Sequence, residues 1–220
     1  MPRPENPELV NEIVNQADAL FRERGYRAAS YSKIAEAAGT TKGLMQYHFK
    51  KKDELACTVM ARVLDRAADA LGYERRPQTA SLESFEQLYR IGQVYFAYLL
   101  HENGYRLFLQ DIVSDFALVD RVLAFNLSWA LDYAYLSEKA TDRAVVESVV
   151  MSMGGFYSLV HYDLVHDGCT DVRLHLRSVV HNVMCALGYE EREAVRTLDA
   201  ARLSDDELAR TLTAMRSHER

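Results

Sequence analysis

Basic side chains gather in one stretch near the N-terminus, residues 22–52. The stretch holds eight Lys or Arg against two Glu, a net charge of +6, and contains five of the six lysines in the chain. The whole chain carries −6, so the remaining 189 residues together carry −12. Ammonium and guanidinium groups bind phosphate oxygens and displace the counterions of a nucleic acid. The focused charge therefore predicts a contact surface for a polyanion, with an ordinary solvated helix face as the alternative.

The same stretch has the pattern of a helix–turn–helix. Short helices are predicted over residues 31–38 and from Thr40 or Thr41 to about residue 49, with Ser30 as a cap and Gly39 at the tight turn. The residues predicted to pack inward are Ile34, Ala35, Ala38, Met45 and Phe49. The residues left more exposed are Thr41, Lys42, Gly43, Gln46, Tyr47 and His48. A short helix with such a polar start can enter the major groove of DNA.

A collinear series of aromatic, small, glycine and basic residues runs through this part of the chain. Its members are Phe21, Gly25-Tyr26, Ser30, Ile34-Ala35, Ala38-Gly39, Lys42-Gly43, Tyr47-His48-Phe49, Lys52 and Leu55. In these positions the chain resembles the tetracycline-repressor (TetR-like) family of bacterial transcription regulators. The resemblance implies an N-terminal DNA-binding head on a larger helical domain that dimerises and binds a small effector.

The resemblance also implies a set of DNA-contacting residues. These are Ser30, Thr41, Lys42, Gly43, Leu44, Gln46, Tyr47, His48 and Lys52. We expect Lys42 to contact a base edge such as guanine O6 and N7, or a phosphate. Tyr47, His48 and Lys52 match family positions that contact the DNA backbone, although Tyr47 and His48 could instead pack between helices. Gln46 stands where the family often has Tyr and could bind an adenine edge, so the operator sequence does not transfer from relatives.

Helical periodicity continues through nearly the whole chain, and alternating strand-like stretches are absent, which predicts an all-α fold. The first helix is expected between Asn6 and Gly25. Further helices are expected over residues 53–71, 81–101, 105–111, 115–137, 142–166 and 171–187. We predict a helix–turn–helix domain over residues 1–52 and an effector-binding and dimerisation domain over 53–220, with a connecting helix at 53–71 and a charged C-terminal extension at 190–220.

The helices expected at 142–166 and 171–187 are candidates for a homodimer interface, because the resemblance implies a four-helix bundle across a twofold axis. Small residues along the first of them permit close helix approach, and an apolar stripe on the second can face it. The predicted interface residues are Ser152, Gly155, Leu159, Leu176, Val180 and Val183. Core packing within one chain is the alternative for these residues, and twofold DNA binding favours the dimer.

Aromatic residues are frequent in the middle of the chain. Most are expected in the core, and a subset lining an apolar cavity would suit an apolar or aromatic effector. The candidates for that subset are Phe96, Tyr105, Phe108, Phe125, Trp129, Tyr133 and Phe156.

Metal-ligand residue types gather at His161, Asp163, His166, Asp167, Cys169, Asp171 and His175. Their types suit zinc, but His161 and His166 are five residues apart and point about 140° from each other on a helix. A charged turn between helices explains the cluster equally well. We expect no metal and no cofactor.

The sequence contains no P-loop, GxSxG, HExxH or dinucleotide fingerprint, so no enzymatic activity is expected. The N-terminus has no apolar signal core, and the longest run without Asp, Glu, Lys or Arg, residues 148–162, is shorter than the ~20 residues of a membrane span. A cytoplasmic protein without a membrane partner is expected, with its three widely spaced cysteines as free thiols.

Together these observations predict a transcriptional repressor. A dimer would bind a near-palindromic operator in double-stranded DNA and be released by a small-molecule effector. The alternatives are a metal-responsive regulator, or a helical enzyme or interaction module that does not bind DNA.

Overall fold

The computed structural model describes residues 6–73, 80–101, 103–166, 168–169 and 171–217. Within these ranges the regular structure is entirely helical, which confirms the predicted fold class. The α-helices are α1 (Pro7–Ala28), α2 (Tyr31–Ala37), α3 (Lys42–His48), α4 (Lys52–Ala70), α5 (Leu82–His101), α6 (Asn103–Val113), α7 (Phe116–Tyr133), α8 (Arg143–Val165), α9 (Val172–Ala186), α10 (Glu191–Ala200) and α11 (Asp205–Ser217). A short 3-10 helix, η1 (Ser137–Thr141), joins α7 to α8.

Capping residues fix the starts of the N-terminal helices as the sequence predicts. Asn6 Oδ1 accepts from Leu9 N at 3.3 Å to start α1. Ser30 Oγ and Thr41 Oγ1 accept in the same way at the starts of α2 and α3. Each such side chain satisfies an amide that has no partner within its own helix.

Boundaries of three helices differ from the prediction. Helix α1 continues past a kink at Gly25 to Ala28, and helix α6 runs from Asn103 to Val113 rather than over residues 105–111, so it includes Gly104. Glycine suits this position in α6, because a Cβ at Gly104 would lie 2.7 Å from Cβ of Arg22 in α1 and would prevent the close approach of the two helices. Helix α7 ends at Tyr133 rather than near residue 137, because Tyr135 adopts a left-handed conformation with φ +60°.

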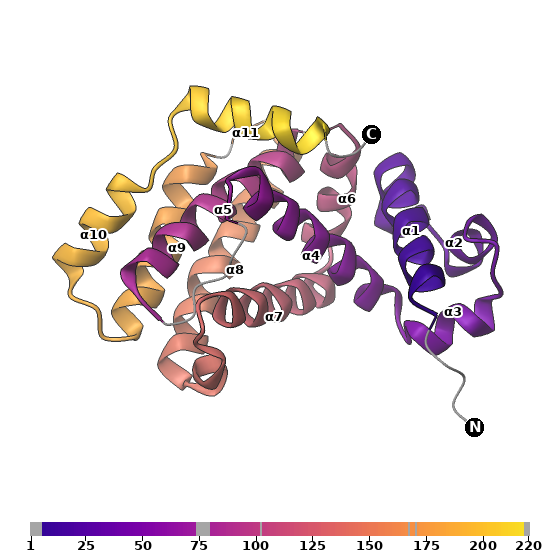
Figure 1. Cartoon of the computed structure of the whole chain (residues 1–220), viewed down its shortest axis with the longest axis horizontal. Helices are drawn as coiled ribbons and strands as arrows, with labels where there is room; N and C mark the ends of the chain where they lie inside the picture. The colour runs from indigo at the N-terminus through magenta and orange to yellow at the C-terminus, as the bar shows by residue number, and fades with distance from the viewer. Residues whose placement is uncertain (1–5, 74–79, 102, 167, 170, 218–220) are drawn as a thin grey trace.

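Helices α1, α2 and α3 form a head at one end of the molecule (Figure 1). Their facing sides carry buried Phe21, Ile34, Ala35, Met45 and Phe49, as the helix–turn–helix pattern predicts. Gly39, at φ +61°, makes the turn between α2 and α3.

The head packs on the body through α1 and α6. The Tyr105 hydroxyl donates to Asp18 at 2.6 Å, and the Phe108 ring stacks on Phe21 with 5.2 Å between ring centroids. Asp111 Oδ2 accepts from the backbone amide of Arg27 at 2.8 Å. The head is therefore held both by the continuous chain into α4 and by a packed helix pair.

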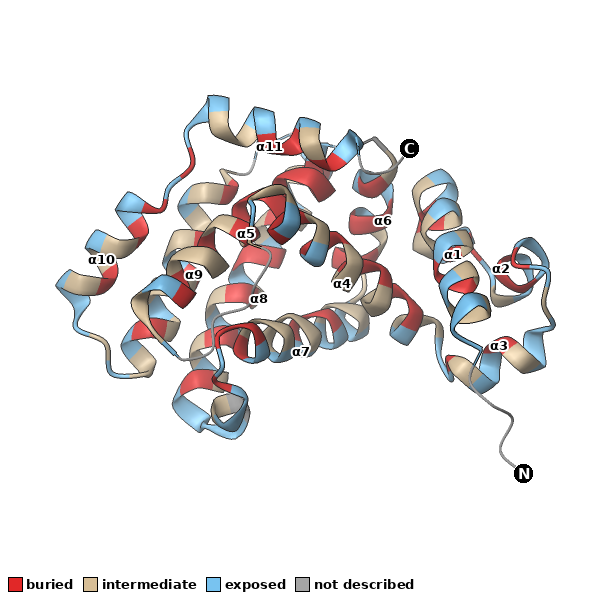
Figure 2. Cartoon of the chain, viewed as in Figure 1, coloured by how far each residue is buried: buried red, intermediate tan, exposed pale blue. Residues whose placement is uncertain are grey.

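Helix α5 lies at the centre of the body and contacts α4, α6, α7, α9, α10 and α11. Burial follows this arrangement, since the buried residues of the surrounding helices lie on their inner sides (Figure 2). Helices α10 and α11 form a C-terminal arm, residues 191–217, along the outside of the body (Figure 1). The charged extension predicted from the sequence is thus folded onto the body over these residues.

The arm is attached through a buried glutamine. Gln93 of α5 is completely buried, donates to Ala201 O at 3.2 Å and accepts from Leu203 N at 3.0 Å. Arg173 of α9 donates to Leu203 O and forms an ion pair of 2.6 Å with Asp205. The segment between α10 and α11 therefore meets polar partners on both α5 and α9.

Candidate nucleic-acid interface and ligand cavity

Helix α3 presents a polar face to solvent. Of its predicted contact residues, Thr41, Lys42, Gly43, Gln46 and Tyr47 are exposed, whereas Leu44 and His48 are half-buried. The opposite face of α3 is anchored in the head by buried Met45 and Phe49, and the Tyr31 hydroxyl donates to the carbonyl of Phe49. The helix is thus fixed on one side and open on the other.

Tyr47 and His48 lie at the end of this face and contact each other. Their rings meet edge to face with 5.2 Å between centroids, and Tyr47 is 53% exposed. Neither residue is buried in the core of the head, so packing between helices does not account for both of them. Ser30, at the start of α2, is exposed as well.

Four exposed lysines lie on α3 or in the segments next to it in the chain. Lys33, Lys42, Lys50 and Lys51 are all exposed, and within the described ranges none of them forms an ion pair with a carboxylate. Arg27, in contrast, lies 3.9 Å from Asp111 in a salt bridge between head and body. The four lysines are therefore available to phosphates.

Lys52 has a structural role that the sequence did not reveal. Its Nζ donates to the carbonyl of Tyr26 at 2.8 Å and to that of Ala29 at 3.2 Å. It also lies 4.1 Å from the centroid of the Tyr26 ring. Partial burial lowers the pKa of this ammonium group. Two of its three N–H groups are used to tie α4 to the end of α1, so a phosphate contact, which remains a prediction, would use the third.

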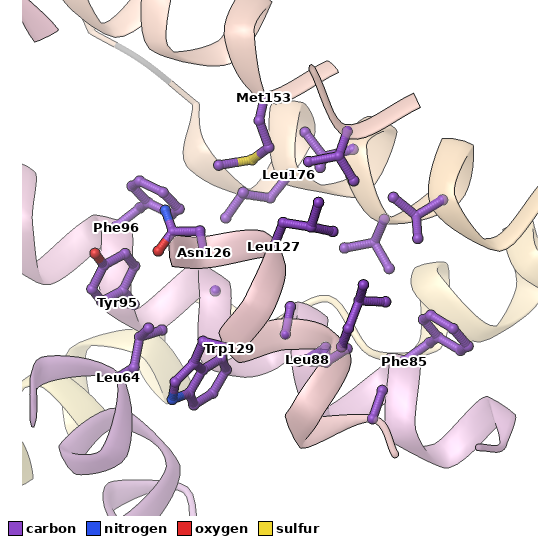
Figure 3. A pocket seen from close by; sticks show the side chains of 18 residues that line it. Leu64, Phe85, Leu88, Tyr95, Phe96, Asn126, Leu127, Trp129, Met153 and Leu176 are labelled. Carbon is purple, nitrogen blue, oxygen red and sulfur yellow. The ribbon is translucent and has the colours of Figure 1, made fainter. Parts of the chain in front are cut away.

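A cavity of about 120 Å³ lies in the body between α4, α5, α7, α8 and α9 (Figure 3). Two of the predicted effector-binding aromatics, Phe96 and Trp129, line it. Aliphatic side chains make up much of the remaining wall, including Leu64, Leu127, Met153 and Leu176. The sequence missed these residues because helical periodicity marks a buried face without saying which buried residues border a space.

The structure places the other five predicted aromatics outside the cavity wall. Tyr105 and Phe108 lie in the α1–α6 contact, where they pack against the head. Tyr133 stacks on Trp129 and donates to Gln87 at 2.8 Å. Phe156 packs edge-on against Phe96, which separates it from the space. Phe125 is half-buried on α7.

The predicted dimer residues divide into two sets. Ser152, Gly155 and Leu159 of α8 border a surface hollow between α8 and α9. Leu176, Val180 and Val183 of α9 instead line the apolar cavity, because that stripe of α9 lies on the side that packs against α5. The outward face of α9 carries exposed Leu174, Ser178, Asn182 and Cys185.

No three His, Cys, Asp or Glu side chains in the described ranges lie close enough together to hold a metal ion. His161 and Asp163 are half-buried, the ring of His166 packs against Tyr162, and Asp171 caps α9 through Leu174 N. His175 borders the hollow beside Gly155, and Cys169 is exposed. Asp167 lies outside the described residues.

Helix α8 is the one described helix whose length and composition would suit a membrane span, with a mean hydropathy of 1.2. One such helix is weak grounds for a membrane protein. Buried Val149, Met153 and Phe156 pack this helix into the body. Part of the apolar surface of α8 therefore belongs to the core of the body.

The geometry defines a class of protein: an exposed helix–turn–helix head on a body that is all-helical over the described residues and contains an apolar pocket. The comparisons agree for the head, since residues 13–57 match the family described as "Bacterial regulatory proteins, tetR family". The chain is TetR-like over this segment, as its motif residues predict.

Two curated relatives are transcription regulators. The chain is 29% identical over 105 residues to the HTH-type transcriptional activator FasR of Mycolicibacterium smegmatis, covering 47% of each chain. It is 34% identical over 73 residues to the HTH-type transcriptional repressor KstR2 of Rhodococcus jostii, covering 33% of this chain and 34% of the relative. The chain thus matches less than half the length of either protein. A solved TetR transcriptional regulator from Rhodococcus sp. RHA1 matches with a TM-score of 0.49 and 15% identity, over 82% of this chain and 96% of that one.

Proposed function

We propose that this protein is a ligand-responsive transcription regulator that binds double-stranded DNA through α3. The observation that carries the proposal is the polar face of α3, anchored from behind by Met45 and Phe49, together with four exposed lysines on or next to α3 that have no carboxylate partner in the described ranges. In this arrangement Lys42 and Gln46 reach base edges in the major groove, and the neighbouring lysines bind phosphates. A cytoplasmic location follows from such a role.

We propose that the protein acts as a homodimer on a near-palindromic operator. A twofold dimer matches two half-sites of a palindrome, and a single head of this size reads only a few base pairs. The outer faces of α8 and α9 suit the interface, because they combine small residues such as Gly155 with exposed Met151, Tyr162 and Leu174. Asn182 Nδ2 of α9 donates a hydrogen bond to Ser152 Oγ of α8 at 2.9 Å, so the two outer faces are linked within one chain.

A small molecule bound in the cavity can affect the head through α4. Leu64 of α4 lines the cavity, and α4 continues directly from the head, where Lys52 ties it to α1. A ligand that favours one position of α4 changes the affinity of the head for DNA. By thermodynamic linkage, bound DNA changes the affinity of the protein for the ligand by the same factor. We propose repression relieved by such a ligand, without enzymatic activity. No observation favours a metal-responsive regulator or an enzyme.

The proposal is tested by selecting DNA from a random pool and measuring affinity by fluorescence anisotropy at several salt concentrations. Log K should fall steeply with log salt, by about 0.9 for each phosphate contacted. Lys42→Ala should weaken binding and relax sequence preference, whereas Lys52→Ala should weaken binding to all sequences alike and reduce the salt slope by about 1.

Lys139→Ala is the matched control, because Lys139 lies in η1, outside the basic stretch, and its loss should change nothing. Salt-independent binding, or equal affinity of the Lys42→Ala variant and the unmodified protein, would contradict the proposal. Lys52→Ala is interpreted only alongside its thermal stability, since that side chain also holds α4 to α1.

A further inference from the structure

The cavity wall has a polar end and an apolar end. Three buried polar atoms in the wall have no hydrogen-bond partner within the described part of the chain: Tyr95 Oη, Asn126 Oδ1 and Trp129 Nε1. Figure 3 shows Tyr95 and Asn126 close together at one end of the cavity, Trp129 apart from them on the same side, and Phe85 at the other end. Buried polar groups in proteins nearly always have a partner, so three unpaired atoms in one wall indicate that a partner comes from outside the chain.

The unpaired atoms differ in what they can bind. The Trp129 Nε1 only donates, the Asn126 Oδ1 only accepts, and the Tyr95 hydroxyl does both. Asn126 Nδ2 already donates to the hydroxyl of Tyr157, which leaves Oδ1 as the amide's remaining acceptor. Burial raises the pKa of Tyr95 well above its ordinary value, so this hydroxyl stays neutral. A matching ligand group must therefore both donate and accept hydrogen bonds.

The rest of the wall restricts the charge of the ligand. No Lys, Arg, His, Asp or Glu is among the described residues that line the cavity. A carboxylate or ammonium group placed there would lose its hydration without gaining a counter-charge, which is strongly unfavourable. The part of the ligand enclosed by the wall should therefore be neutral.

The volume restricts the size. At about 120 Å³ the cavity is close to the roughly 150 Å³ that holds a benzene ring in an apolar protein interior. This volume limits the part of a ligand that the wall encloses. The hydrocarbon part of a fitting ligand thus has about the size of one six-membered ring.

We propose that this cavity binds a compact neutral alcohol, with its hydroxyl between Tyr95 and Asn126 and its hydrocarbon part toward Phe85 and Leu88. The hydroxyl donates to Asn126 Oδ1 and accepts from the Tyr95 hydroxyl. That this alcohol acts as an effector rests on the proposed function, whereas its binding does not.

The chain carries its own probe for the test, because Trp129 is the single tryptophan and lies in the wall. The full-length protein, without DNA, is titrated with benzyl alcohol, toluene and benzoate while tryptophan emission is recorded. These probes share one ring and differ in the group attached to it. We expect benzyl alcohol to bind about three- to tenfold more tightly than toluene, as one or two buried hydrogen bonds would give, and benzoate to bind at least tenfold more weakly than the alcohol.

Two variants test whether the preference for the alcohol comes from hydrogen bonds to its hydroxyl rather than from the shape of the cavity. Asn126→Leu and Tyr95→Phe should each retain toluene binding and reduce the preference for the alcohol to less than twofold. Calorimetry supplies a second readout of the same affinities. Tyr135→Phe is the matched control, since that tyrosine is 63% exposed and lies outside the cavity wall, and it should leave all three affinities unchanged.

The inference is overturned if no probe changes the emission of Trp129 or releases heat, if toluene binds as tightly as the alcohol, or if benzoate does. It is also overturned if both cavity variants keep the full preference for the alcohol. The DNA titrations described above are independent of these measurements. Loss of DNA binding with an intact alcohol preference would remove the proposed function and leave the ligand assignment standing.

Discussion

At the scale of single residues, neighbouring positions in the head have different roles despite similar sequence signals. Lys42 and Lys52 both match the family's motif, yet Lys42 is exposed while Lys52 is bound to the carbonyls of Tyr26 and Ala29. The sequence identifies both as cations, but it does not show which backbone carbonyls lie within reach of each. Position in the folded head therefore decides whether a lysine stabilises the fold or is free for DNA.

Gly43 offers a test in which stability and DNA binding change in opposite directions. The residue lies inside α3, and a Cβ added there would meet nothing within 4 Å. Gly43→Ala should raise the free energy of unfolding by roughly 0.5–1 kcal/mol, because alanine is the better helix former. The same methyl group would hold α3 away from DNA and lower its affinity.

Chemical denaturation and anisotropy measure the two effects of Gly43→Ala. Gly154→Ala is the control, since Gly154 is also helical with open space around it but lies in α8, far from the head in sequence. An unchanged DNA affinity in the stabilised Gly43→Ala variant would show that this glycine is not needed for close approach.

At the scale of the elements, the α1–α6 contact determines how the head sits on the body. The two helices approach so closely that Gly104 faces the backbone of Arg22, and a Cβ added at Gly104 would lie only 3.1 Å from the Arg22 carbonyl oxygen. Gly25, at φ +77°, interrupts α1 beside Asp111 and exposes the Arg27 amide to the carboxylate. Two glycines and one carboxylate thus make this contact possible.

Gly104→Ala should disrupt the contact between head and body. The added methyl group would clash with backbone as well as with side-chain atoms of Arg22, so it cannot be accommodated by a rotamer change alone. We expect a loss of about 1–3 kcal/mol in the free energy of unfolding. Thermal denaturation of this variant beside Gly154→Ala measures the effect, and equal stability of the two would contradict a tight α1–α6 contact.

Much of the element-level structure was predictable from the sequence, and the reasons are local. The caps at Asn6, Ser30 and Thr41 and the turn at Gly39 depend only on neighbouring residues, so helix starts in the head were predicted closely. The cavity wall was not, because Leu64 and Leu176 come together from helices more than a hundred residues apart. Likewise, the α9 stripe was correctly identified as apolar, but periodicity could not say that it faces α5 rather than a second chain.

At the scale of the whole molecule, the C-terminal arm connects parts of the body that are distant in sequence. Its inner face is buried at Ala194, Leu198, Leu203, Leu212 and Met215, and α11 contacts both α4 and α5. The sequence showed helical spacing in this charged segment but contained no sign of its docking site. The arm is therefore an integral layer of the body and reaches the helix that leads from the head.

Removing the buried amide that holds the arm should destabilise the whole body. Gln93→Leu leaves the Leu203 amide and the Ala201 carbonyl without their partner, which should cost about 1–3 kcal/mol. Gln110→Leu is the control, because Gln110 is exposed on α6. Urea denaturation measures the difference, and hydrogen exchange should locate faster exchange at Leu203. Equal unfolding midpoints for the two variants would show that the arm does not depend on this contact.

The unequal distribution of charge along the molecule also has a kinetic consequence. The +6 of residues 22–52 is partly offset by acidic residues earlier in α1, so residues 1–52 together carry +3 and residues 53–220 carry −9. The charge therefore differs in sign between the head end and the body, which makes the protein an electric dipole. In the field of a polyanion such a dipole experiences a torque that turns the head forward before contact. Encounters that begin with the wrong face are thereby repelled or reoriented. The association rate, more than the lifetime of the bound state, should therefore depend on this asymmetry.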